Sequence, residues 1–405
     1  MEEFAAYVSP QKAATYKLAG WDFVPGRREG VRVWDWEGSR SWIDCRTAGG
    51  VFNLGHNPQV IIDAVKQGLD ETDMGDHMLA SAYRARLAHR LADLTPGDLR
   101  YTTFGAAGGE AVDFAIKLAR GYTGRAGIVS AIKGYHGHTG MALAATDDYG
   151  DRWGPLAPGF QRIPFGDIGA AESTITNDVA AVIMETIPAT AGFTVPPDDW
   201  YPRLRQLCDD RGALLILDEV QAGLGRTGRL WAFEEWGVVP DMMVLGKGMS
   251  SAVIPLSSAT YREHLQSFFD SDPFCHLSSG GGSNLACIAA LAMLDTITGT
   301  GFLDHVRAMG VRFEEGFQQL RERRGGVFQG WNRRGLMMGL VLASEDCGPR
   351  MTRALARHGV IAVFSGFNRH ILQLMPPLVI NPPEVDEVLE ALDRAMSEVE
   401  RDLAK

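Results

Sequence analysis

The chain has 405 residues, a length typical of two domains rather than one small core. With 45% hydrophobic and 22% charged residues it has an ordinary globular composition, and its formal net charge of −11 disfavours nucleic acid or an anionic membrane surface as its main partner. Its five cysteines are scattered and form no Cys-x-x-Cys pair, which argues against a disulfide framework and a structural zinc site, so we expect no metal.

The N-terminal residues are acidic and lack the basic and then apolar pattern of a signal peptide. No apolar run approaches the roughly 20 residues that a membrane-spanning helix needs. We therefore expect a protein of the cytoplasm with no membrane association.

Residues 30–42 predict a small N-terminal meander. Apolar runs rich in β-forming residues then alternate with stretches of helical period through the middle of the chain. The predicted strands are residues 100–104, 127–132, 180–185, 213–217, 242–245 and 256–261. The predicted helices between them include residues 109–122 and 200–211. This alternation predicts an α/β domain with a mixed, mostly parallel sheet.

The pattern changes after about residue 284. The elements predicted there are helices at residues 284–298 and 302–324, strands at 335–341 and 370–374, and a closing helix at 383–403. We therefore predict a large domain over residues 45–285. A smaller α+β domain is predicted from both chain ends, residues 1–44 and 286–405.

A glycine-rich turn, Gly105-Ala106-Ala107-Gly108-Gly109, joins the strand at residues 100–104 to the next helix. Free N–H groups at a helix start, together with the helix dipole, suit a phosphate, and glycines let the backbone approach it closely. An ordinary tight turn has the same pattern, so this signal is weak on its own.

Tyr135 follows a predicted strand and lies between glycines in Gly134-Tyr135-His136-Gly137-His138. An aromatic side chain in that position can stack on a planar cofactor ring. An aromatic ring that only covers a loop would give the same pattern.

Asp218 and Lys247 each follow an apolar run. Asp218 directly follows residues 213–217, at the carboxyl end of a predicted strand, where open α/β sheets bind ligands; a helix N-cap is its alternative role. Lys247 lies 29 residues later, after the run at 242–245 and between two glycines. Such an amine and carboxylate are what a pyridoxal phosphate (PLP) enzyme needs, the amine for a Schiff base and the carboxylate to keep the pyridine nitrogen protonated.

Two further segments carry candidate ligand-binding residues, one close to this pair and one before a helix. Val220 and Gln221 are close enough to Asp218 to present an apolar face and an amide to the same ligand. The loop at residues 278–284, which contains Ser279, carries hydroxyl groups. It is either a plain connector or a source of hydrogen bonds to a phosphate.

With these segments in this order, the chain resembles the class III aminotransferases, fold-type I PLP enzymes that include ornithine, acetylornithine and 4-aminobutyrate aminotransferases and dialkylglycine decarboxylase. The resemblance runs from residues 30–57 to Pro376-Pro377-Leu378. Its most specific part is the Asp-Glu-Val-Gln block at 218–221 and the Gly-Arg-Thr-Gly block at 225–228, followed by Gly246-Lys247-Gly248.

The resemblance implies a role for each matching residue. Lys247 would form the Schiff base and shuttle protons, and Asp218 would pair with the pyridinium nitrogen. Tyr135 and Val220 would cover the two faces of the ring, and Gln221 would hydrogen-bond its phenolic oxygen.

The resemblance also implies a phosphate site and an assembly. Gly108 and Gly109 would cradle the phosphate. Ser279 stands where the family usually has a threonine that reaches the phosphate from the neighbouring subunit, so a homodimer with sites at its interface is implied. Glu185 matches a family glutamate near the cofactor.

The chain departs from the family at positions that bind anions. The phosphate loop reads Ala107-Gly108-Gly109 and lacks the usual hydroxyl, so backbone amides and Ser279 must do more of the anion binding. His138 replaces an arginine that many members use for a distal carboxylate.

Near the C-terminus, Gln373 replaces the arginine that clamps the α-carboxylate, and a glutamate that often pairs with this arginine aligns with Thr190. A neutral amide does not replace a bidentate arginine. Arg369, four residues before Gln373, would point the same way on a strand and supply a displaced contact, or it is simply an exposed arginine. We therefore predict that glutamate is not held in the common way.

The resulting hypothesis is an aminotransferase that moves an amino group between an amine or amino acid and a keto acid or aldehyde, with Lys247 as the base. Return of the proton to the substrate carbon would instead give a racemase or epimerase. Loss of carbon dioxide first would give a decarboxylating transaminase, and the same residues serve all three reactions. A catalytically inactive PLP-fold binding protein is the non-enzyme alternative, which the intact Lys247 and Asp218 disfavour.

Overall fold

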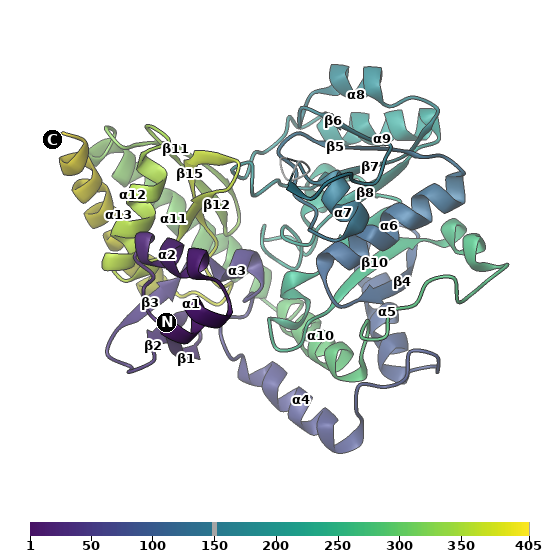
Figure 1. Cartoon of the computed structure of the whole chain (residues 1–405), viewed down its shortest axis with the longest axis horizontal. Coiled ribbons are helices and arrows are strands. Elements are labelled where there is room, and N and C mark those ends of the chain that lie inside the picture. Colours follow the sequence, from purple (N-terminus) through teal and green to yellow (C-terminus); the bar gives the residue numbers. More distant parts are fainter. Residues whose placement is uncertain (148–151, 405) are drawn as a thin grey trace.

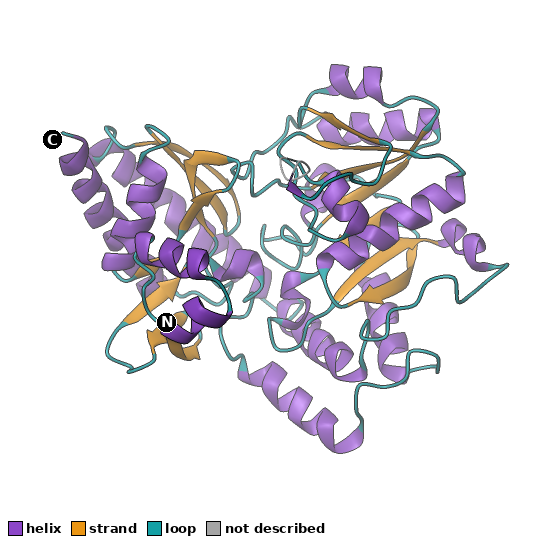
Figure 2. Cartoon of the chain, viewed as in Figure 1, coloured by secondary structure: helices purple, strands orange, loops and turns teal. Residues whose placement is uncertain are grey.

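Two lobes make up the computed structural model of the chain, which describes residues 1–147 and 152–404. Both chain ends lie in one lobe, on the left of Figure 1, and the middle of the chain forms the other. Strands lie inside each lobe and helices cover them (Figure 2). A smaller domain formed by both chain ends is therefore observed.

A seven-stranded sheet forms the centre of the larger lobe. In sheet order its strands are β4 (Leu99–Gly105), β10 (Ser257–Arg262), β9 (Met242–Leu245), β8 (Leu214–Asp218), β7 (Val179–Glu185), β5 (Gly127–Ala131) and β6 (Phe160–Ile163). β10 runs antiparallel to both of its neighbours, whereas the strands from β9 to β6 run parallel. The prediction of a mixed, mostly parallel sheet is confirmed.

Helices cover both faces of this sheet. Those that contact its strands are α5 (Ala82–Leu94), α6 (Gly108–Thr123), α7 (Gly140–Ala145), α8 (Ile168–Thr174) and α9 (Trp200–Arg211). α10 (Asn284–Ile297) packs against α5 and α4 (Gln59–Glu71). Because successive strand residues point to opposite faces, Leu215 and Leu217 enter one core and Ile216 enters the other. The central strands are therefore continuous apolar runs, as parallel strands buried on both faces require.

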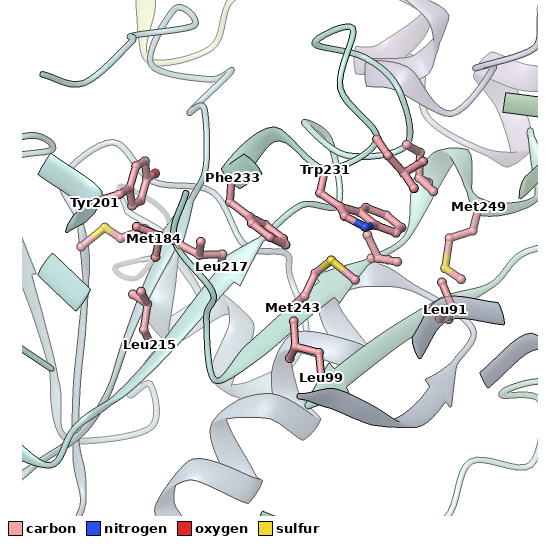
Figure 3. Close-up of a cluster of buried hydrophobic side chains, with 14 of the residues drawn as sticks. Leu91, Leu99, Met184, Tyr201, Leu215, Leu217, Trp231, Phe233, Met243 and Met249 are labelled. Atoms are coloured by element: carbon pink, nitrogen blue, oxygen red, sulfur yellow. The ribbon is translucent and has the colours of Figure 1, made fainter. Parts of the chain in front are cut away.

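Figure 3 shows part of the core that includes Leu215 and Leu217. Trp231 and Phe233 lie beside Leu217 and Met243 there, and all four side chains are buried. The indole nitrogen of Trp231 donates a hydrogen bond to the backbone oxygen of Leu94, which ends α5. The strand ends near the site are thus supported by a closely packed core.

Two smaller sheets form the second lobe. One contains β1 (Pro25–Glu29), β2 (Arg32–Asp35), β3 (Ser41–Asp44) and β13 (Val360–Ile361), and the other contains β11 (Phe328–Arg334), β12 (Met337–Leu342), β15 (Asn368–Leu374) and β14 (Val363–Ser365). The helices of this lobe are α1 (Glu2–Tyr7), α2 (Pro10–Leu18), α11 (Phe302–Arg323), α12 (Cys347–Arg357) and α13 (Pro382–Leu403). A capping box between Asn381 and Glu384 fixes the start of α13.

The core of the larger lobe continues past residue 285, the predicted end of the large domain. The apolar side chains of α10 pack into the core of the larger lobe, and the core of the second lobe begins again at Val306 in α11. Periodicity predicts a helix here but not the core into which it packs.

No single helix among the described residues is long and apolar enough to cross a membrane, and α10 and α11 pass that test only as a pair bent by 67°.

Candidate active site

A cavity of about 150 Å³ lies at the carboxyl ends of β7 and β8 and reaches Lys247 after β9. Its walls are formed by Gly108, Gly109, Tyr135, His136, Gly137, Glu185, Ile187, Asp218, Val220, Gln221, Ala222 and Lys247. Eight of the residues singled out in the sequence therefore meet in one place. The strand register explains part of this, because Glu185 and Asp218 are partners at the ends of neighbouring parallel strands.

Lys247 has a positive φ of 43° and begins a short 3-10 helix (Lys247–Ser250). Its Nζ atom donates a hydrogen bond of 2.8 Å to Oε1 of Gln221. Loss of hydration lowers the pKa of this amine, and the charge of Arg46 lowers it further, while the carboxylates of Asp218 and Glu185 act in the opposite direction. The amine of Lys247 therefore lies at the cavity and loses its proton more readily than the amine of an exposed lysine.

The carboxylate of Asp218 is held on both oxygens. Oδ1 accepts the backbone N–H of Val220 at 3.0 Å, and Oδ2 lies 2.8 Å from Nδ1 of His136. Both side chains are buried, and Nε2 of His136 has no partner among the described residues. His136 was quoted in the sequence only as a neighbour of Tyr135; the signal for its role was its position directly after the aromatic residue in the same loop.

Glu185 faces the same cavity. Its Oε1 accepts the backbone N–H of Tyr135 at 2.9 Å, which ties the loop with the aromatic ring to β7. Burial is the main reason that the pKa of Glu185 rises to about 7, with His136 opposing this rise and Asp218 adding to it. Because strands β7 and β8 are neighbours, the charge of Asp218 lies close enough to Glu185 to contribute to this rise in pKa.

The start of α6 lies directly beside the cavity. Ala107 is the N-cap residue and no side chain caps this helix end. A Cβ atom on Gly108 would lie 3.1 Å from Cγ1 of Val220, and one on Gly109 would lie 2.8 Å from Oγ1 of Thr139. The two glycines are therefore required for close packing here, and the hydroxyl of Thr139 occupies the place of a side chain at position 109.

Val220 and Gln221 both line the cavity. Val220 packs against Gly108 and Gly246, and the amide nitrogen of Gln221 lies 3.2 Å from the sulfur of Met375 in the second lobe. Tyr135 lines the cavity, and its ring lies edge-on to that of His138, with centroids 5.4 Å apart.

Three residues that were candidates for substrate contacts do not line this cavity. The amide nitrogen of Gln373 donates to the backbone oxygen of Ala189 at 2.7 Å and to Oγ of Ser365 at 3.1 Å. Arg369 is exposed, and its guanidinium lies 5.6 Å from the ring centroid of Phe364. His138 contacts Tyr135 at the edge of the site rather than facing Lys247.

Ser279 also lies away from the cavity of its own chain. It is exposed in the loop before α10, beside a second hollow that Ser278 and Gly281 line. Among the described residues, no group of three or more His, Cys, Asp or Glu side chains is arranged to hold a metal ion. The titratable side chains that line the cavity are those of Lys247, Asp218, Glu185, His136 and Tyr135.

Comparison with known proteins places this arrangement among aminotransferases. Residues 18–396 match the family described as aminotransferase class-III. An uncharacterized aminotransferase of Archaeoglobus fulgidus is 46% identical over 397 residues, which cover 98% of this chain and 93% of the relative.

Two solved structures share the fold over almost the whole chain. The ornithine aminotransferase of Toxoplasma gondii, whose active site holds PLP at partial occupancy, has a TM-score of 0.88 and 25% identity, covering 95% of this chain and 92% of its own. An (S)-enantioselective omega-transaminase of Thermomicrobium roseum has a TM-score of 0.87 and 29% identity, covering 93% of both chains.

Proposed function

The chain belongs to the class-III aminotransferase family, and from this premise we propose which of its residues carry out the reaction. The predictions of a fold-type I PLP-dependent transferase, of transamination between an amine and a keto acid, and of PLP as the cofactor are confirmed. The observation that supports our assignment of the site is that Lys247, Asp218 and Glu185 line one cavity.

The residues around Lys247 fit PLP. A partly buried lysine amine, a buried carboxylate and an uncapped helix start all border the same cavity. Gly108 and Gly109 line the cavity, and because no side chain caps the start of α6, its backbone N–H groups are available to a phosphate. When bound, the cofactor draws electrons away from the carbon next to the substrate nitrogen, so that this carbon loses its proton more easily.

Lys247 attaches the cofactor and moves the proton in this proposal. Its lowered pKa makes the neutral amine more accessible, which both tasks require. Gln221 orients Nζ through its 2.8 Å hydrogen bond. The carboxylate of Asp218, fixed by His136 and by the N–H of Val220, presents negative charge to the pyridine nitrogen.

In this proposal, the N–H groups at the start of α6 hold the phosphate together with hydroxyl groups from two other segments. Thr139 supplies one of them, because its Oγ1 stands where the side chain of residue 109 would be and makes no capping bond to α7. Ser279 supplies another from a second copy of the chain, since it lies outside the cavity of its own chain. The family resemblance and the exposure of Ser279 support a homodimer.

Reduction with borohydride tests the role of Lys247. The PLP-loaded protein is treated with borohydride and digested with trypsin, and the labelled peptide is identified by mass spectrometry. We expect the pyridoxyl label on Lys247. A label on any other lysine would overturn the assignment.

We propose further that glutamate is not the donor held in the usual way, because Gln373 and His138 provide no guanidinium and Gln373 is bonded within the protein. A panel of amines and amino acids, mixed one at a time with the loaded protein, tests this through the change in cofactor absorbance. Fast reaction of glutamate and 2-oxoglutarate alone would contradict it.

A further inference from the structure

A larger hollow adjoins the cavity at Lys247. It has a volume of about 720 Å³, and Gly108 and Lys247 line both spaces. Its other walls come from Arg28 and from side chains within residues 51–62, 106–107 and 250–256, and we call it the outer hollow. Because Lys247 borders both spaces, a substrate whose reacting carbon lies at Lys247 can extend into the outer hollow.

Most of the outer hollow is apolar, but it also carries positive charge. Its apolar walls are formed by Val51, Phe52, Ile62, Val253, Pro255 and Leu256. Of the described residues, Arg28 and Lys247 line it and no aspartate or glutamate does. An apolar space with two cationic side chains and no carboxylate suits a molecule with a carbon chain and a negative charge.

The edge strand β1 directs Arg28 towards this space. Residues of β1 alternate between exposed and partly buried, and Arg28 is on the partly buried side. Its neighbour Arg27 is exposed, lies 4.9 Å from the ring centroid of Trp34 and forms an ion pair with Glu29. The two adjacent arginines therefore lie on opposite faces of the strand, and only the second of them lines the outer hollow.

Hydrogen bonds fix the backbone of Arg28 to another wall of the hollow. Its oxygen accepts a hydrogen bond of 2.7 Å from Nδ2 of Asn57. Two residues later, the N–H of Gly30 donates to the oxygen of His56 at 3.0 Å, and the N–H of His56 donates to the oxygen of Gly30 at 2.7 Å. Since His56 and Asn57 also line the hollow, the side chain of Arg28 starts from a fixed position at its edge.

The guanidinium of Arg28 is available to a ligand. Over residues 1–147 and 152–404 it makes neither a hydrogen bond nor an ion pair, although the side chain is partly buried. A partly buried charge without a partner is unfavourable, and a bound anion would remove this cost. Arg46, Arg226 and Arg369 line neither the outer hollow nor the cavity at Lys247.

We propose that Arg28 binds a carboxylate of the substrate in the outer hollow, while the apolar walls contact the substrate's carbon chain. Because Arg28 lines the hollow but not the cavity at Lys247, the chain separates this carboxylate from the reacting carbon. Arg28 is thus a specificity-determining residue, and the substrate class is amines whose apolar chain ends in a carboxylate. This inference rests on the aminotransferase function proposed above.

The variants Arg28→Gln and Arg28→Lys, with Arg27→Gln as the matched control, test the assignment in the loaded protein. The first half-reaction is followed by cofactor absorbance with 6-aminohexanoate and with hexylamine, which has the same chain length and no carboxylate. Loss of a charged hydrogen-bonded contact predicts a rise of about 10- to 100-fold in KM for 6-aminohexanoate with Arg28→Gln. The rate with hexylamine stays unchanged, Arg28→Lys lies between Arg28→Gln and wild type, and Arg27→Gln behaves as wild type.

Equal losses for the two amines in Arg28→Gln, or the same loss for 6-aminohexanoate in Arg27→Gln, would overturn the proposal. So would a wild-type protein that converts hexylamine but not 6-aminohexanoate. Equilibrium dialysis of PLP separates the substrate's carboxylate from the cofactor's phosphate. Weaker PLP binding by Arg28→Gln would assign Arg28 to the phosphate and overturn the proposal, whereas unchanged PLP binding supports it.

Calorimetry of the loaded protein with hexanoate, an unreactive carboxylate, gives a readout that needs no turnover. Wild type and Arg27→Gln must bind hexanoate, and Arg28→Gln must lose this binding. Equal binding by all three proteins, or no binding by wild type, would overturn the proposal. If the wild-type protein converts no amine at all, the proposed function fails, while this titration still decides whether Arg28 binds a carboxylate.

Discussion

Glu185 and Asp218 lie at the ends of paired strands beside Lys247, and burial changes how readily Glu185 and Lys247 hold a proton. Burial disfavours every charged form, so it raises the pKa of Glu185 and lowers that of Lys247. Both shifts move these groups towards neutral pH, where proton transfer is most useful.

The substitution Glu185→Gln tests the protonation of this carboxyl group through stability. Folding raises its pKa from 4.5 to about 7, so its contribution to stability is fully present below pH 4.5 and is lost as the pH rises through about 7. Glutamine keeps an oxygen for the N–H of Tyr135 but does not titrate. In the cofactor-free protein, the fall in free energy of unfolding between about pH 5 and about pH 8 should shrink by up to about 3 kcal/mol. Urea unfolding at both pH values measures this, and an unchanged fall would contradict the raised pKa.

Thr139→Val tests the hydroxyl at the phosphate site. Valine keeps the shape of the side chain and removes the hydrogen bond, which corresponds to a loss of cofactor affinity of about 10-fold. Equilibrium dialysis of PLP measures the affinity, and Thr15→Val, on the exposed face of α2, serves as the control. Wild-type affinity in Thr139→Val would show that this hydroxyl does not contact the phosphate.

At the scale of secondary-structure elements, turns and helices approach their neighbours closely at glycines, where a larger residue would have little room for its side chain. Gly49 lies against Lys247 and Gln221, and Gly108 lies against Val220. In the second lobe, Gly310 brings α11 against the turn between β11 and β12, where a Cβ atom would lie 2.8 Å from the backbone oxygen of Gly335. A backbone atom cannot rotate away as a side chain can, so the approach at Gly310 depends on glycine.

Gly310→Ala should therefore destabilise the protein although alanine favours helices. Overpacking against backbone predicts a loss of about 1–3 kcal/mol in the free energy of unfolding. Gly169→Ala in α8 is the matched control, since the nearest atom to a Cβ there is a side-chain oxygen of Asp167 at 3.5 Å, and we expect it to be neutral or slightly stabilising. Denaturant unfolding of both variants measures the difference. Equal stability of the two would refute the role of the close contact.

At the scale of the whole molecule, the site lies where the lobes meet. The amide of Gln221 contacts Met375, Thr47 donates to the backbone of Met375, and Asn53 donates to the backbone oxygen of Leu224. Residues from the start, middle and end of the chain thus set the geometry around Lys247. A ligand that binds this site must therefore stabilise both lobes in their native arrangement.

Added PLP should raise the stability of the folded protein. At a free concentration 100 times its Kd, binding to the folded state alone adds about 2.7 kcal/mol. Thermal unfolding with and without PLP measures this as a rise in Tm. Lys247→Ala should show a smaller rise at the same concentration, because the covalent attachment is lost; an equal rise would argue against attachment at Lys247.

The sequence by itself determined most of the fold and the residues around the cofactor. Long apolar runs followed by Asp218 and by Gly246-Lys247-Gly248 predicted the strand ends, because local pattern fixes which residues end a buried strand. The core to which α10 belongs was not specified by the sequence, since periodicity shows which face of a helix is buried but not what covers it.

Only the tertiary structure decided how side chains distant in sequence meet. It brought His136 to Asp218 and Thr139 to the place of the missing hydroxyl at Gly109, and it bonded Gln373 to Ala189. These contacts join segments tens to hundreds of residues apart. Their distances depend on the packing of both lobes and on left-handed turns such as residues 47–50, and the order of residues along the chain does not specify them.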